Sequence, residues 1–432
     1  MKFFSSSKII LRIIGFLYRH ILKRILFCID AEMVHVSAVS IGEFFGNYQM
    51  TRRFTKSLFF LKPDVSLRQK FENIVFQSPV GLAAGFDYEG RLTQILPDLG
   101  FGFSTIGTIT HQPYEGNPKP RLGRFPMSRS LLVNKGFKNN GAVFTAARLE
   151  KLNFDIPIGV SIGKTNILLD ENESIDDIVE CFKVFEGTSE KRNFGNENAK
   201  IRAKTLKDDE GVSEEDTTRR SEAFAAESLH LQSKGSFLEV PVDCSVQHSY
   251  YELNISCPNL SGTVSFYDIQ LLRRLLEALK SLHISRPVFV KMPTSKSNEE
   301  VVKMIEVLKL FPCIKGLIFG NLSRDPSLLH PLEANTKMVG SFSGMPVQKR
   351  SDELIRLAYK MCGKQMIIIG CGGIFDAHDA YRKIRLGASL LQLITGMIFE
   401  GPQFISELND GLGFLLKKDG FQSISDAIGV DV

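Results

Sequence analysis

Short apolar runs recur along the chain, and most are followed by a stretch in which apolar positions return at helical spacing. The eight runs cover residues 80–84, 103–107, 158–162, 251–255, 288–291, 317–320, 366–370 and 390–394. Helical patterns between them include residues 269–282, 298–310, 351–361 and 377–386. Runs that are apolar throughout are typical of parallel strands buried on both faces. Eight strand–helix units predict an α/β fold, a closed (β/α)8 barrel of the TIM type.

One segment inside the barrel region breaks this rhythm. Residues 186–247 are polar and dense in charge, and they lack a clear apolar period. This composition predicts a mostly disordered insertion in a loop. A partner-binding segment is the functional alternative, although no motif in it is specific.

The N-terminal region has a different pattern. Residues 8–27 are apolar but interrupted by Lys8, Arg12, Arg19 and Lys23, which recur at helical spacing. The uncharged stretch between Arg12 and Arg19 is far shorter than the roughly 20 residues that a spanning helix needs. Residues 1–28 therefore predict a basic amphipathic helix in a membrane interface. Because no acidic residue precedes Asp30, a mitochondrial presequence is an alternative; a cleaved secretory signal fits less well.

Residues 29–62 form a second predicted unit, a helical region with its own apolar faces. Pro63 and Asp64 punctuate its end, as proline and aspartate commonly do at helix boundaries. The barrel is then expected to occupy residues 63–432.

Composition changes this picture in two respects. The formal net charge is +5, and much of the basic excess lies at the N-terminus, which indicates a membrane surface and not a nucleic acid as partner. The seven cysteines are scattered, with no CxxC pair and no zinc-like spacing, so reduced thiols and no metal site are expected.

Polar residues and glycines gather where the predicted strands end, which is the rim that carries the active site in barrels of this kind. Glycines after the seventh strand, at positions 370, 372 and 373, are typical of a phosphate site made by bare backbone N–H groups. Lys291 ends the fifth strand. It is either an exposed strand-end lysine or a fixed cation that stabilises an anionic reduced flavin.

The segment from Asn254 to Asn259 follows the fourth strand and carries the sharpest chemical signal. Its two asparagines offer donors and acceptors to a planar ring with amide-like edges, and Pro258 stiffens the loop between them. Cys257 can act as a base through its thiolate, because its surroundings can lower a thiol pKa of about 8.5. A lone cysteine is more often a buried bystander, but the flanking asparagines favour a chemical role.

Several motifs, in order, resemble the dihydroorotate dehydrogenases, most closely their membrane-associated, quinone-linked branch. They are Ser-Pro-Val-Gly-Leu-Ala-Ala-Gly-Phe-Asp at 78–87, Gly-Asn-Pro-Lys-Pro-Arg-Leu at 116–122, Asn-Lys-Gly-Phe at 134–137, Asn-Ile-Ser-Cys-Pro-Asn at 254–259 and Gly-Ala-Ser-Leu-Leu-Gln at 387–392. The segment 134–137 is one residue shorter than the family's substrate loop. The resemblance covers residues 29–408 without the charged insertion, and the helical region before the barrel favours the quinone-linked branch.

The resemblance implies oxidation of (S)-dihydroorotate to orotate in pyrimidine (UMP) biosynthesis, with FMN as prosthetic group, a membrane quinone as acceptor and Cys257 as catalytic base. FMN would contact Ala84, Gly85, Phe86, Asp87, Tyr88, Thr108, Ser161, Asn254, Lys291, Gly320, Gly344, Gly373, Ile394 and Thr395. The substrate would contact Asn134, Lys135, Gly136, Phe137, Asn254, Asn259, Asn321 and Leu322. Residues 29–62 would give the quinone access. The membrane would be the mitochondrial inner membrane in a eukaryote, or the cytoplasmic face of the cell membrane in a bacterium.

Five residues depart from the pattern of the quinone-linked branch. Cys257 stands where that branch usually has serine, and cysteine is typical of the soluble branch that uses fumarate or a nicotinamide. The others are Tyr88 for lysine, Ser161 for asparagine, Leu322 for threonine and Ile394 for tyrosine. These departures leave two alternatives: a related FMN-barrel dehydrogenase with another substrate or acceptor, and a degenerate, non-catalytic barrel.

Overall fold

The computed structural model describes residues 6–188, 247–260, 262 and 264–432. Its centre is a closed barrel of eight strands, in the order β10-β12-β13-β3-β4-β7-β8-β9, and every neighbouring pair is parallel. The strands are β3 (Val80–Leu82), β4 (Phe103–Ile109), β7 (Ile158–Ile162), β8 (Tyr250–Asn254), β9 (Val288–Lys291), β10 (Ile314–Phe319), β12 (Ile367–Cys371) and β13 (Leu390–Leu393). The predicted (β/α)8 barrel is confirmed, and each predicted apolar run overlaps one of these strands.

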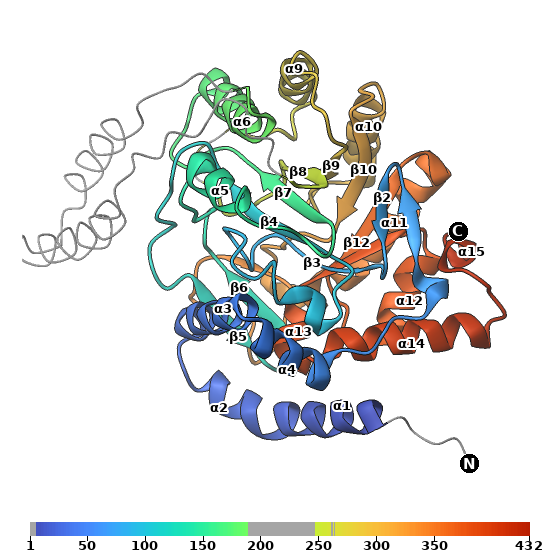
Figure 1. The fold of residues 1–432 in the computed structure, drawn as a ribbon. Helices are drawn as coiled ribbons and strands as arrows, with labels where there is room; N and C mark the ends of the chain where they lie inside the picture. Colours follow the sequence, from blue (N-terminus) through green and yellow to red (C-terminus); the bar gives the residue numbers. More distant parts are fainter. Residues whose placement is uncertain (1–5, 189–246, 261, 263) are drawn as a thin grey trace, which may run out of the picture.

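Helices surround the barrel (Figure 1). They are α5 (Ala142–Leu149), α6 (Glu171–Glu186), α9 (Ile269–Lys280), α10 (Asn298–Leu308), α11 (Gln348–Cys362), α12 (Ala377–Arg385), α13 (Thr395–Glu400), α14 (Phe404–Lys418) and α15 (Ile424–Ala427). Several begin at a side chain that caps free backbone N–H groups. Asp268 caps α9, and Ser297 with Glu300 forms a capping box on α10. Helix α6 extends to Glu186, the first residue of the predicted insertion, most of which lies outside the described residues.

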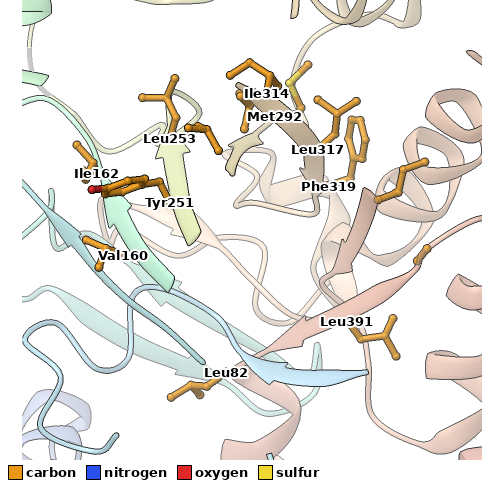
Figure 2. Packing of buried hydrophobic residues seen from close by; sticks show 14 of the residues in the cluster. Leu82, Val160, Ile162, Tyr251, Leu253, Met292, Ile314, Leu317, Phe319 and Leu391 are labelled. Carbon is orange, nitrogen blue, oxygen red and sulfur yellow. The ribbon is translucent and has the colours of Figure 1, made fainter. Parts of the chain in front are cut away.

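The main core lies between the strands and these helices. Successive strand residues point to opposite faces, so on β8 Tyr251 and Leu253 join this outer cluster while Tyr250 belongs to a separate cluster inside the barrel. Figure 2 shows Leu253, Leu317 and Leu391 among the residues of the outer cluster. Glu252 and Asn254, which alternate with the outward residues, therefore belong to the barrel interior.

The N-terminal ends of the strands are closed by aromatic rings, which we call the aromatic plug: Phe76, Phe103, Tyr250 and Phe289. Phe76 comes from a hairpin of β1 (Gln69–Phe71) and β2 (Ile74–Phe76). Its ring meets Phe103 edge-on at 5.4 Å, and Tyr250 lies 5.0 Å from Phe289 between centroids. All four side chains are at most 1% exposed. The hairpin was not predicted, because two strands of three residues leave almost no periodic signal.

The opposite end carries additional structure. A three-stranded antiparallel sheet contains β5 (Leu122–Phe125), β6 (Ser130–Val133) and β11 (Ser341–Phe342). The helical region predicted for residues 29–62 contains two helices, α3 (Ala31–Asn47) and α4 (Gln49–Phe59). They are separate because Tyr48 between them is extended, with φ −117° and ψ 132°. Arg52 on α4 fixes this helix to the barrel through Asp98, at 2.8 Å.

The first helical segment consists of α1 (Ser6–Leu17), a π-helical turn η1 (Tyr18–Leu22) and α2 (Lys23–Phe27). Lys8 pairs with Asp410 at 2.5 Å and Arg19 with Glu407 at 3.2 Å, so basic side chains face helix α14. Apolar residues point to solvent instead: Ile13, Phe16, Ile21 and Ile25 are 54%, 58%, 51% and 56% exposed. Within the described part of the chain, no helix combines the length and apolar character required to cross a membrane.

Candidate active site

A cavity of about 930 Å³ lies between the carboxyl ends of the strands and helices α3 and α4. This is the upper range for small-molecule sites, which commonly measure about 300–1,000 Å³. Most of the residues predicted for the site line it: Ala84, Gly85, Phe86, Tyr88, Thr108, Lys135, Gly136, Phe137, Asn254, Cys257, Asn259, Lys291, Asn321, Leu322, Ile394 and Thr395. The fold therefore brings together side chains from six barrel strands and from the loop at 134–137.

The floor of the cavity is polar. The amide nitrogen Nδ2 of Asn254 donates to Thr108 Oγ1 at 2.8 Å, and Thr108 contacts Ser161 between hydroxyl oxygens at 3.0 Å. Lys291 lies beside them, 4% exposed, with its Nζ 3.3 Å from Glu252 Oε1. Lys291 is thus a buried, paired cation, not an exposed strand-end lysine. Burial is the largest single influence and acts to lower the pKa of Lys291, but Glu252 together with the thiols of Cys371 and Cys257 outweighs it, so the pKa is raised.

The loop at 254–259 is held from several sides. Asn259 donates from Nδ2 to the Val133 carbonyl and accepts from Ser341 Oγ, both at 2.8 Å. Asn321 donates to Ser256 Oγ at 2.6 Å. A hydrogen-bonded loop loses little conformational entropy when a ligand arrives, so this loop is preorganised for binding.

Cys257 lines the cavity with its thiol partly exposed. Burial raises its pKa to about 11, although a backbone N–H of Asn259 and the charges of Lys291 and Arg324 act in the opposite direction. The surroundings could have lowered this pKa, as the sequence allowed, but here they act in the opposite direction. The cause is desolvation: the protein atoms around the sulfur penalise the thiolate more than the two cations stabilise it.

Glycines keep one wall of the cavity open. Gly85 has φ +107°, and an added Cβ would meet only Ile394 Cδ1, at 3.8 Å. A side chain at this position would project into the cavity, so glycine leaves the backbone exposed for a flat group to pack against. Gly320 is different: its Cβ would lie 1.8 Å from the Cys371 carbonyl oxygen, so glycine is required there by the close approach of two strands.

Several predicted residues lie near the cavity without lining it. The Asp87 carboxylate accepts from the backbone N–H groups of Arg91 and Leu92, both at 2.8 Å, which ties up its own loop. Ser161 lies one layer below Thr108, and Asn134 accepts from Asn117 Nδ2 at 2.9 Å. The remaining three are glycines with positive φ: Gly320, Gly344 and Gly373. Their roles in binding stay predictions.

Sequence reasoning missed residues that act between separate elements. Glu32 on α3 pairs with Lys135 at 3.3 Å, and the Lys135 ammonium lies 5.2 Å from the centroid of the Tyr88 ring. A cation therefore stands beside Tyr88, where the lysine of the family pattern is missing. His35 on α3 contacts the Phe86 carbonyl oxygen through Nε2 at 2.8 Å. A helical signal for residues 29–62 could not reveal these contacts, because they depend on which face of α3 meets the barrel.

The outer part of the cavity is apolar. Helices α3 and α4 contribute Ala38, Ile41, Phe45 and Phe54 to its lining, and the first helical segment contributes Tyr18, Leu22 and Leu26. Tyr18 is fixed by a hydrogen bond of 2.7 Å from its hydroxyl to the Ile398 carbonyl. Arg124 also lines this part, and its guanidinium lies 4.9 Å from the centroid of the Phe27 ring. One cavity thus joins a polar floor to an apolar mouth.

Comparisons with known proteins agree with this architecture. The dihydroorotate dehydrogenase family model matches residues 66–195 and 236–416. The chain is 31% identical over 411 residues to dihydroorotate dehydrogenase (quinone) of Mycobacterium sp. (strain KMS), covering 95% of this chain and 98% of that protein. It is 33% identical over 377 residues to the protein of the same name from a Nostoc species, covering 85% and 84%.

A solved structure gives the same result for the fold. The crystal structure of DHODH from Eimeria tenella in complex with ferulenol matches with a TM-score of 0.69 at 24% identity, covering 93% of this chain and 96% of that chain. The family model and the bacterial relatives span the barrel and its site segments, so the chain belongs to the dihydroorotate dehydrogenase family.

Proposed function

We propose that this chain oxidises (S)-dihydroorotate to orotate in pyrimidine (UMP) biosynthesis, with FMN as prosthetic group and a membrane quinone as electron acceptor. The observation that carries the proposal is the single cavity that joins Asn254, Cys257 and Lys291 at its floor to an apolar mouth between α3 and α4. A flavin at the floor would be within reach of a polar substrate on one side and of an apolar acceptor through the mouth.

The residues at the floor fit FMN. The absence of a side chain at Gly85 leaves a flat stretch of backbone, Lys291 supplies a buried cation, and Asn254 and Thr108 supply polar atoms for the edge of a ring. Gly344, Gly373 and the start of α13 at Thr395 would hold the phosphate at the rim. The bound flavin would accept the hydride of the reaction and later release two electrons.

Dihydroorotate fits the space between the loop at 254–259 and the loop at 134–137. Asn134, Asn254, Asn259 and Asn321 would supply amide groups that match its ring edges. Lys135 would supply the positive charge for its carboxylate, in place of the lysine that Tyr88 replaces in the family pattern. Phe137, 8% exposed, closes this side against water.

Cys257 would take the proton from the ring carbon next to the carboxylate-bearing carbon, while that second carbon loses its hydride. Its sulfur must be a thiolate to accept the proton, and a pKa of about 11 leaves only a small thiolate fraction at neutral pH. The cost is partly recovered because a thiolate of high pKa is a strong base. Lys291 and Arg324 favour the charged form as it appears.

The same helices support attachment of the protein to a membrane. Residues 1–62 contain ten Lys and Arg against three Asp and Glu. Exposed apolar side chains continue from α1 onto α3 and α4, where Ile41, Phe44 and Phe54 are 59%, 55% and 58% exposed. Exposed apolar side chains in a segment with a basic excess suit the headgroup region of an anionic bilayer. We propose peripheral attachment, to the mitochondrial inner membrane in a eukaryote or to the cytoplasmic face of the cell membrane in a bacterium.

The test uses the full chain purified with detergent. We expect an oxidised flavin spectrum that bleaches when dihydroorotate is added without oxygen and returns when a short-chain ubiquinone analogue is added. Fumarate and NAD are tested as acceptors in parallel, because Cys257 is the residue of the soluble branch. Recovery of the spectrum with fumarate or NAD, and not with the quinone, contradicts the proposed acceptor. A flavin that dihydroorotate does not bleach contradicts the proposed substrate.

A further inference from the structure

A carboxylate lies inside the barrel directly below the cavity floor. Glu252 is on β8, two residues before Asn254, and its side chain is 0% exposed. Three donors surround it: Lys291 Nζ at 3.3 Å, Ser161 Oγ at 2.9 Å and Gln392 Nε2 at 3.4 Å. Glu252 does not line the cavity, so it reaches any ligand there only through these neighbours.

Placing a carboxylate at this depth is energetically expensive. A buried charge is tolerated when it is paired and hydrogen-bonded, and Glu252 meets both conditions. A buried ion pair is nevertheless weak evidence for stability, because an apolar pair of the same size often stabilises a core equally well. The barrel interior just below holds such apolar packing in the aromatic plug. The presence of Glu252 is therefore better explained by an effect on Lys291 than by packing.

Lys291 is the one lysine at the floor of the cavity among the described residues, and Glu252 is its ion-pair partner. The two members of the pair have opposite electrostatic effects on the cavity. A cation at the floor attracts negative charge that develops above it, and a carboxylate 3.3 Å from that cation cancels part of the attraction. Water screens charges poorly in a buried site, so a ligand in the cavity experiences the reduced net positive charge.

We propose that Glu252 sets the reduction potential of the flavin by offsetting part of the positive charge that Lys291 presents to the cavity. This inference rests on the proposed binding of FMN at the floor. A flavin gains negative charge when it is reduced, so full exposure to Lys291 would stabilise the reduced form. Glu252 lowers this stabilisation, keeps the potential lower and makes the reduced flavin a better electron donor to the quinone. Glu252 is a positioning residue and not a catalytic one, because it acts through Lys291.

The positions of Ser161 and Gln392 support this role. Ser161 donates to Oε1 of the carboxylate, the oxygen that Lys291 also contacts, and Gln392 donates to the other oxygen, Oε2. Gln392 is fixed in turn by a hydrogen bond of 2.8 Å to Thr105 Oγ1. These hydrogen bonds hold the carboxylate at a constant distance from Lys291, so its effect on the positive charge of Lys291 is also constant. The flavin contact predicted for Ser161 stays a prediction, and its observed hydrogen bond adds support of Glu252.

The experiment compares the midpoint potentials of the flavin in the wild-type holoenzyme and in E252Q. The glutamine keeps an oxygen for Lys291 and Ser161 but removes the negative charge. We expect the potential to rise by at least about 30 mV, the equivalent of a tenfold change in the equilibrium constant of a two-electron couple. E252D retains the charge and should stay close to the wild type. E252M, a second neutral variant, keeps the test decisive if E252Q does not fold.

A matched control removes a carboxylate just outside the barrel. Glu186 lies outside the barrel, where its Oε1 accepts a hydrogen bond of 2.6 Å from Tyr251 Oη. Tyr251 is the neighbour of Glu252 on β8, but its side chain is on the outer face of the strand. E186Q should leave the potential unchanged. An unchanged potential in both E252Q and E252M, or an equal shift in E252D and E252Q, overturns the proposal and assigns Glu252 a packing role. A wild-type protein that binds no FMN overturns the proposed function itself, which is a separate result.

Discussion

Cys257 offers the most direct test of the chemistry, because its replacement by alanine removes the proposed proton acceptor without changing the charge of the resting site. General-base catalysis by a positioned side chain contributes about 10²–10⁴-fold to rate, so C257A should slow flavin reduction by dihydroorotate by about that factor. The pKa of about 11 adds a second expectation. Only about one thiol in 1,000 is ionised at pH 8 for such a pKa, and the ionised fraction rises about tenfold with each pH unit.

The assay is anaerobic stopped-flow mixing of the enzyme with saturating dihydroorotate, followed at the flavin band. The wild-type rate of bleaching should rise about 100-fold from pH 7 to pH 9, because the thiolate is the active form. C257S is the informative companion: a hydroxyl ionises at a higher pH than a thiol, so its ionised fraction and its rate should stay below those of the wild type from pH 7 to pH 9. FMN content and substrate affinity serve as controls for the integrity of the site.

Two results would refute this reasoning. A wild-type rate that is flat between pH 7 and pH 9 means that the thiolate population does not limit proton removal. A C257A variant within about twofold of the wild type means that another group accepts the proton, and Cys257 is then a bystander of the loop.

Three further outcomes follow from the structure. Burial lowers the pKa of His35 to about 4 and keeps its imidazole neutral. The contribution of His35 to the free energy of unfolding is therefore fully present above about pH 6.5 and is lost as the pH falls through 4. Urea titrations should show about 3 kcal/mol of acid destabilisation that is absent in H35Q. Gly320→Ala places a Cβ 1.8 Å from the Cys371 carbonyl oxygen and should cost more than about 3 kcal/mol, seen as loss of soluble protein or a large fall in Tm. Arg52→Ala leaves the buried Asp98 without its cation and should cost about 1–3 kcal/mol, raising the KM for quinone while the rate of flavin bleaching by dihydroorotate stays unchanged.

The barrel was predictable because each strand overlaps a short, mainly apolar run, and because turn residues separate the runs. Helix boundaries were accurate where a capping side chain marks them, as Ser297 does for α10. The boundary at Tyr48 was not predictable from the sequence. Its extended backbone separates α3 from α4, but tyrosine is not a helix breaker, so no local sequence pattern marks this boundary.

The site residues that lie at the ends of predicted strands could be predicted from the sequence, whereas contacts between separate elements could not. The asparagines of the loop at 254–259 and the lysine at 291 stand out as strand-end residues. Glu252 was missed, although a glutamate inside an apolar strand and two residues before Asn254 is an inward-facing charge that the period of two reveals. Glu32 and Tyr18 were missed because nothing local says which side of a helix will meet the barrel.

The aromatic plug has a consequence for traffic through the molecule. Within the described residues, Phe76, Phe103, Tyr250 and Phe289 fill the lower end of the barrel, so the cavity above them opens towards the loop at 134–137 and helices α3 and α4. Under the proposed function, the polar floor would hold substrate and product, and the apolar helices α3 and α4 would line the path of the electron acceptor. Such an arrangement lets the helical side change with the type of membrane or acceptor while the chemistry below is preserved.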